Sequence, residues 1–133
     1  MGEATTIHIC VTCKSADDPS EERAGARLLR AVRDLAAERG ADVRIVPVEC
    51  LSVCKRPVTF GYAAPGKWTY VYADAAPEAA APVILDGAAL YAEAPDGLIP
   101  WRQRPEHLKR NVIARTPPLA PVSPDPSLPE AAE

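Results

Sequence analysis

The chain has 133 residues, enough for one domain with a modest core, and its net charge is −3. Hydrophobic residues make up 47% of it, as in globular proteins, and no stretch is apolar for long enough to predict a transmembrane helix. No basic stripe predicts binding to nucleic acid. The N-terminus lacks the basic start and apolar run of a signal peptide, so we expect a cytoplasmic protein.

The first third of the chain predicts a strand, a helix and a second strand. β-branched residues alternate over 5–11, and apolar residues recur at helical spacing between 19 and 39. Asp18 and Glu21 form a capping box at the predicted start of this helix, and Gly40 is its predicted stop. With a second strand predicted over 42–48, this order favours a right-handed, parallel βαβ unit.

The rest of the chain predicts a hairpin followed by helices. Aromatic residues alternate over 57–63 and 67–74, on either side of a turn at Ala64-Pro65-Gly66, and should face a helix layer. Helices are predicted over 76–93, where Pro82 favours a start near 81, and over 105–113. We expect one domain over 1–116. The proline-rich segment 117–133, poor in large apolar residues, is predicted to be a disordered tail.

All four cysteines fall in two close pairs, Cys10 with Cys13 and Cys50 with Cys54, and each pair directly follows a predicted strand. The carboxyl ends of neighbouring parallel strands lie at one edge of a sheet, so the pairs should converge although 36 residues separate them. In a reducing compartment, such thiols are more often metal ligands or redox groups than structural disulfides. The pattern predicts one site built from four thiolates.

The clustering of the cysteines in two close pairs argues against thiols that are simply buried as small apolar groups. Three functions then remain open from the cysteines alone. A [2Fe–2S] cluster needs four thiolates in loops that donate hydrogen bonds to sulfur, with Thr12 and Ser52 as candidate helpers. Zinc in a structural or interaction module also accepts four thiolates and favours Cys-x2-Cys. A dithiol oxidoreductase at Cys10 and Cys13 is disfavoured, because Cys13 does not lie at the N-terminus of the predicted helix.

The segment Cys50-Leu51-Ser52-Val53-Cys54-Lys55-Arg56-Pro57-Val58, followed by a hairpin, resembles the thioredoxin-like [2Fe–2S] ferredoxins, which include the small ferredoxin subunit of respiratory complex I. The order of the elements and the gap between the cysteine pairs agree over 5–92. The resemblance implies a thioredoxin-like α/β fold with a four-stranded mixed sheet, helices packed on it and the cysteine loops at one edge.

For function, the same resemblance implies a [2Fe–2S] cluster with four ligands, namely Cys10, Cys13, Cys50 and Cys54. It implies a one-electron carrier rather than an enzyme, and a redox partner protein, with no membrane and no nucleic acid involved. A homodimer is compatible with the sequence. Those ferredoxins place a longer stretch between their first two ligands, whereas only Val11 and Thr12 intervene here, so zinc stays an alternative.

Over almost the whole chain, four segments are similar to an uncharacterised family of bacterial predicted metal-binding proteins: CVTC, CLSVCKRPVTFGY, GKWTYVYAD and DGLIPWRQRP. Members of that family sometimes occur beside genes for cobalamin synthesis. This association implies an electron or metal partner in cobalt handling, and hence an alternative role as a metal-handling accessory protein.

Two histidines and one basic segment are further candidates. His8 should point to the same face of its strand as Cys10, with solvent as its expected environment, and His107 is expected on the surface. The segment 101–110 gathers Trp101, Arg102, Arg104, Lys109 and Arg110, which could bind a partner or a phosphate. We expect instead a solvated helix, with the tryptophan holding the loop to the core. No phosphate loop or catalytic triad appears in the sequence.

Overall fold

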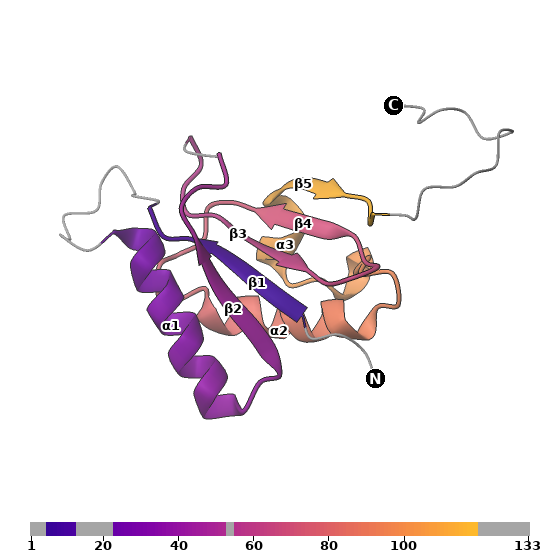
Figure 1. The fold of residues 1–133 in the computed structure, drawn as a ribbon, viewed down its shortest axis with the longest axis horizontal. Coiled ribbons are helices and arrows are strands. Elements are labelled where there is room, and N and C mark those ends of the chain that lie inside the picture. The colour runs from indigo at the N-terminus through magenta and orange to yellow at the C-terminus, as the bar shows by residue number, and fades with distance from the viewer. Residues whose placement is uncertain (1–4, 13–22, 53–54, 120–133) are drawn as a thin grey trace, which may run out of the picture.

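The structure is a computed structural model that describes residues 5–12, 23–52 and 55–119 (Figure 1). Cys13 and Cys54 lie outside the described residues, as do both members of the predicted capping box and most of the predicted tail. The division into a domain over 1–116 and a disordered tail over 117–133 therefore stays a prediction.

A mixed sheet forms the centre of the fold, with the strand order β2-β1-β3-β4-β5. The first two strands pair in parallel and the other pairs are antiparallel. The strands are β1 (Thr5–Cys10), β2 (Val43–Val48), β3 (Phe60–Ala63), β4 (Thr69–Tyr72) and β5 (Val112–Thr116). The mixed sheet is confirmed, but it has five strands rather than the expected four, because 112–116 pairs with β4.

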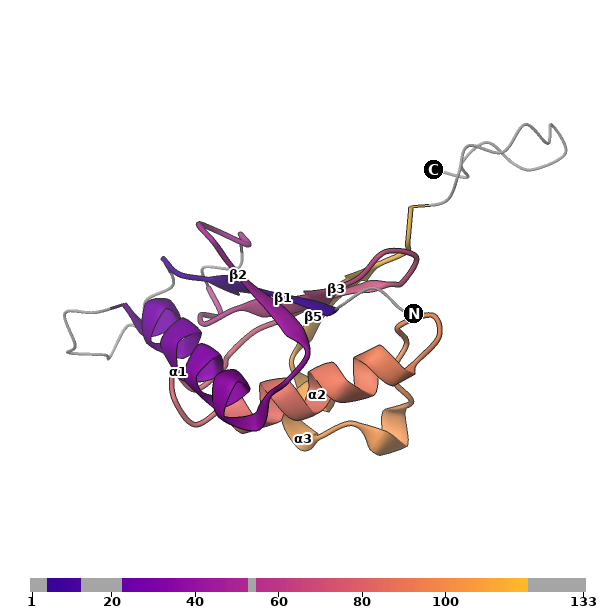
Figure 2. The same cartoon turned by 60° about the horizontal axis from the view of Figure 1, so that its bottom comes forward.

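The helices all lie on one face of this sheet, which gives a two-layer molecule (Figure 2). They are α1 (Ala24–Arg39), α2 (Ala81–Glu93), the 3₁₀ turn η1 (Trp101–Gln103) and α3 (Glu106–Arg110). In the described part of the chain, no helix covers the opposite face, and none is long and apolar enough to cross a membrane. The start of α2 agrees with the position that Pro82 predicted.

The start of α1 differs from the prediction. Arg23 is extended, with φ −63° and ψ 145°, so the helix begins at Ala24 and Asp18 cannot be its N-cap. The first turn instead packs closely against the end of β1, where Gly25 meets the backbone of Cys10. The predicted stop is confirmed: Gly40 has φ 65°, and its amide donates a hydrogen bond to the carbonyl of Ala37.

An aromatic cluster fills the space between the sheet and the helices, as the alternating pattern predicted. Phe60, Tyr62, Tyr70 and Tyr72 project from β3 and β4, and Tyr91 joins them from α2, all with no exposed surface. Neighbouring rings lie 5.0–6.3 Å apart between centroids. The predicted turn between these strands also forms, because the amide of residue 67 bonds the carbonyl of residue 64 at 3.1 Å.

The segment after α2 departs most from expectation. The helix α3 covers only Glu106–Arg110, and the chain then becomes β5 instead of continuing as helix to 113. Trp101 does not hold this segment to the core, since 57% of its surface is exposed. That role falls to Ile99 and Leu108, which are 1% and 0% exposed.

Candidate metal centre

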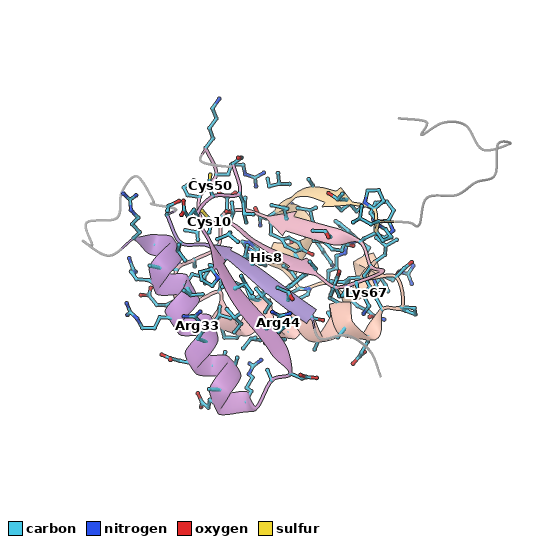
Figure 3. The ribbon with its side chains drawn as sticks, viewed as in Figure 1. His8, Cys10, Arg33, Arg44, Cys50 and Lys67 are labelled. Carbon is cyan, nitrogen blue, oxygen red and sulfur yellow. The ribbon has the colours of Figure 1, made fainter. Side chains whose placement is uncertain are left out.

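Cys10 and Cys50 lie at the same edge of the sheet, where the parallel strands β1 and β2 end (Figure 3). Cys10 is the last residue of β1 and stands opposite Val48, the last residue of β2. Cys50 follows two residues later. The pairing of two parallel strands thus brings one member of each cysteine pair together. The other members, Cys13 and Cys54, lie outside the described residues, so the four-ligand set stays a prediction.

Cys10 is held firmly and is almost fully buried, with 2% of its surface exposed. Its amide donates to the carbonyl of Thr59 at 3.1 Å, which ties it to the chain entering β3. Its thiol donates to the carbonyl of Glu49 at 3.5 Å, and the hydroxyl of Thr12 lies 3.6 Å from the sulfur. This thiol therefore has a fixed position beside the residue that precedes Cys50.

Cys50 is exposed, and its sulfur accepts a hydrogen bond from a backbone amide. The donor is the amide of Ser52, at 3.1 Å, in a turn where Ser52 has φ 64°. Amide hydrogen bonds to sulfur stabilise negative charge on it, as the sulfur of a metal-bound thiolate requires. The hydroxyl of Thr12 donates instead to the carbonyl of Glu49. Of the two candidate helpers, Ser52 thus donates a hydrogen bond to a cysteine sulfur, and the role of both in binding a cluster stays a prediction.

Arg56 anchors the chain just after the second cysteine pair, a contact that the sequence did not predict. Its guanidinium donates to the carboxylate of Asp74 at 2.8 Å and to the side-chain oxygen of Asn111 at 3.0 Å. The amide of Asp74 returns a hydrogen bond to the carbonyl of Arg56. Because these partners lie 18 and 55 residues away in sequence, no local pattern could reveal them.

The donor chemistry of this edge fits a thiophilic metal. Cys10 and Cys50 supply the described thiols of this edge, and the described residues alone contain no group of three or more cysteine, histidine or acidic side chains that could hold a metal ion. Thiolate donors with an amide hydrogen bond suit both an iron–sulfur cluster and zinc. The dithiol alternative is weakened, because Cys13 lies eleven residues before Ala24, the first residue of α1.

The two histidines do not join this site in the described structure. His8 is half-buried on the uncovered face of the sheet, where it lines a shallow depression with Thr6, Arg44 and Val46. His107 was expected on the surface, but it is half-buried. Its Nε2 lies 3.0 Å from the carbonyl oxygen of Ala73, and its ring stacks on Phe60.

Comparison with known proteins gives one family and one fold. Residues 7–118 match the model of a family described as "Protein of unknown function (DUF1636)". The chain belongs to this family. No curated protein matches its sequence.

Two solved structures of the thioredoxin-like [2Fe–2S] ferredoxin from Aquifex aeolicus resemble this DUF1636 protein. One has a TM-score of 0.56 at 15% identity and covers 87% of this chain and 96% of the ferredoxin. The other, of the wild-type ferredoxin, has a TM-score of 0.52 at 14% identity and covers 84% and 98%. At this identity the likeness shows the fold alone. The predicted α/β, thioredoxin-like fold is thereby confirmed.

Proposed function

We propose that this DUF1636 protein is a ferredoxin-like carrier of one electron, with a [2Fe–2S] cluster bound by Cys10, Cys13, Cys50 and Cys54. The observation that carries the proposal is the 3.1 Å hydrogen bond from the Ser52 amide to the sulfur of Cys50, at the strand end beside the buried Cys10. The fold shared with a [2Fe–2S] ferredoxin supports it.

The residues around the cysteines have distinct tasks in this proposal. When bound, the cluster supplies a group that accepts and donates one electron. Burial of Cys10 keeps water from one side of the site, whereas exposure of Cys50 leaves the other side accessible to a redox partner. The Ser52 amide stabilises the negative charge that reduction adds. Arg56 keeps the second cysteine loop attached to the sheet.

Anaerobic purification followed by metal and sulfide analysis tests the proposal. We expect red-brown protein with equal amounts of iron and acid-labile sulfide. Titration with dithionite should consume one electron per cluster and produce an electron paramagnetic resonance signal. Loss of colour on reduction without that signal, or iron without sulfide, would contradict a [2Fe–2S] carrier.

A zinc-binding structural or interaction module is the second candidate. The short Cys10-x2-Cys13 spacing favours it, because zinc sites commonly use this spacing. Colourless protein with one zinc per chain would establish this alternative. Zinc removal by a chelator should then unfold the domain, which melting curves before and after chelation would detect.

A further inference from the structure

Trp101 is a large exposed side chain that takes no part in the hydrophobic core. Its side chain is 57% exposed, while its neighbours Ile99 and Leu108 fix the segment to the core. Among the described residues, Leu119 is the one other large hydrophobic side chain with such exposure, and it lies beyond the last strand. This tryptophan adds apolar surface that is available to a binding partner.

Cationic side chains surround the Trp101 ring and are partly fixed in place. The guanidinium carbon of Arg104 lies 5.5 Å from the ring centroid, and the amine of Lys109 lies 5.6 Å from it. Arg104 is oriented by hydrogen bonds that it donates to the carbonyl of Ile99 at 2.9 Å and the hydroxyl of Tyr70 at 3.2 Å. The exposed Arg102 is the next residue along the chain.

The charge of this surface is not neutralised locally. Within the described part of the chain, Arg102, Arg104 and Lys109 form no ion pair, whereas Arg110 pairs with Glu106. Segment 101–110 carries four cationic residues and one carboxylate, in a chain whose net charge is −3. This segment is therefore positively charged, whereas the rest of the chain carries a net negative charge. Such an asymmetry orients an approaching acidic molecule.

We propose that Trp101 with Arg102, Arg104 and Lys109, the Trp101 surface, is a docking site for an acidic protein partner. An apolar group of the partner would cover the indole ring, and its carboxylates would meet the surrounding cations, since tryptophan and arginine dominate binding energy at interfaces. Nucleic acid fits less well, because three unpaired cations neutralise few phosphates and the remaining charge repels them. The proposal does not depend on which metal the cysteines bind.

Tryptophan fluorescence of the full chain tests the proposal. In a Trp68→Phe background, Trp101 is the only tryptophan of the chain. The probe is a short synthetic peptide rich in glutamate with a central Leu-Phe pair. We expect it to shift the Trp101 emission to shorter wavelength in a saturable, salt-sensitive manner. The same peptide with glutamine in place of glutamate should bind at least tenfold more weakly.

Charge reversal supplies the matched control. Arg102→Glu with Lys109→Glu should weaken peptide binding at least tenfold. Arg33→Glu with Arg44→Glu, at two exposed positions on α1 and β2, changes the net charge equally and should leave binding within twofold (Figure 3). Equal losses in both double variants would overturn the proposal, as would tighter binding of single-stranded oligothymidylate than of the acidic peptide.

The acidic C-terminal segment of the chain is the competing occupant. It contains Asp125, Glu130 and Glu133. A variant with amides at these three positions should bind the peptide as the parent does. If neutralisation instead shifts the Trp101 emission to longer wavelength and allows peptide binding that the parent lacks, the surface belongs to the chain's own tail and the partner proposal fails.

Discussion

Gly25, at the first turn of α1, lies directly against the carbonyl oxygen of Cys10: a Cβ at Gly25 would be 1.9 Å from that oxygen. The oxygen belongs to the backbone, so it cannot move aside as a flexible side chain would. The helix and the first cysteine strand can approach this closely only because residue 25 has no side chain. The position of α1 and the position of Cys10 are therefore coupled.

Gly25→Ala should weaken both folding and cluster binding. We expect about 1–3 kcal/mol of lost stability from overpacking, and less iron per folded chain because the end of β1 is displaced. Gly40→Ala is the control, since its φ of 65° makes alanine costly by about 1–2 kcal/mol with no atom near the added Cβ. Urea denaturation and iron analysis separate the two effects. Equal iron content in both variants would contradict the coupling.

The effect of a substitution at Ser52 on iron binding should depend on whether the new residue tolerates a positive φ. The φ of 64° at this position suits glycine and opposes β-branched residues. Ser52→Gly should therefore retain iron at the wild-type level, whereas Ser52→Val should lose most of it, because the turn that points the amide at the Cys50 sulfur is strained. Iron per chain after anaerobic reconstitution measures this. Retention of iron in the valine variant would show that the turn is unimportant to the site.

Sequence reasoning succeeded where the signal was local. The alternation of Phe60, Tyr62, Tyr70 and Tyr72 showed which face of the hairpin is buried, and Gly40 marked the end of α1. The pairing of β1 with β2 followed from the strand–helix–strand order, and it brought Cys10 to the chain segment that carries Cys50. These features depend on periodicity and on short-range chain geometry.

Features set by distant contacts could not be predicted in the same way. The strand β5 forms because 112–116 pairs with β4, whereas the predicted helix ran on to 113 and this distant pairing was not predicted. The helix α1 begins at Ala24, where its first turn lies against Cys10, whereas the sequence offered Asp18 as a good local cap. Ile99 and Leu108 are buried while Trp101 is exposed, and the spacing of these apolar residues in the sequence does not show which of them enters the core.

Removing a tyrosine hydroxyl should change the free energy of unfolding differently at two buried positions. The hydroxyl of Tyr62 donates to the carbonyl of Ile84 at 2.6 Å, so Tyr62→Phe should cost about 1–2 kcal/mol. The hydroxyl of Tyr72 is buried without a hydrogen-bond partner among the described residues, so Tyr72→Phe should be neutral or stabilising. Urea denaturation of both variants compares them. Greater destabilisation from Tyr72→Phe would be inconsistent with the described packing.

Alkaline pH should destabilise the domain through its buried tyrosines. Burial raises the pKa of Tyr62 and Tyr72, and burial followed by repulsion from Tyr70 raises the pKa of Tyr91 to about 12. The unfolded chain releases these protons near pH 10.0, before the folded protein does. Stability is therefore fully present below about pH 10 and is lost as pH rises toward 12.

Unfolding by urea at a series of pH values, combined with absorbance at 295 nm, checks this dependence. We expect the free energy of unfolding to decline above about pH 10, and tyrosinate absorbance to appear together with loss of structure. A free energy of unfolding that stays constant up to about pH 11.5 would contradict the assignment, since the folded and unfolded states would then release these protons alike.

The most direct test of the account is iron and acid-labile sulfide per chain in the four single variants Cys10→Ser, Cys13→Ser, Cys50→Ser and Cys54→Ser, reconstituted anaerobically beside the parent. The account predicts equal iron and sulfide in the parent, and loss of most of the visible chromophore in every variant. Parent protein that binds zinc in place of iron, or wild-type iron and sulfide in Cys50→Ser and Cys54→Ser, would contradict a [2Fe–2S] cluster shared by the two cysteine pairs.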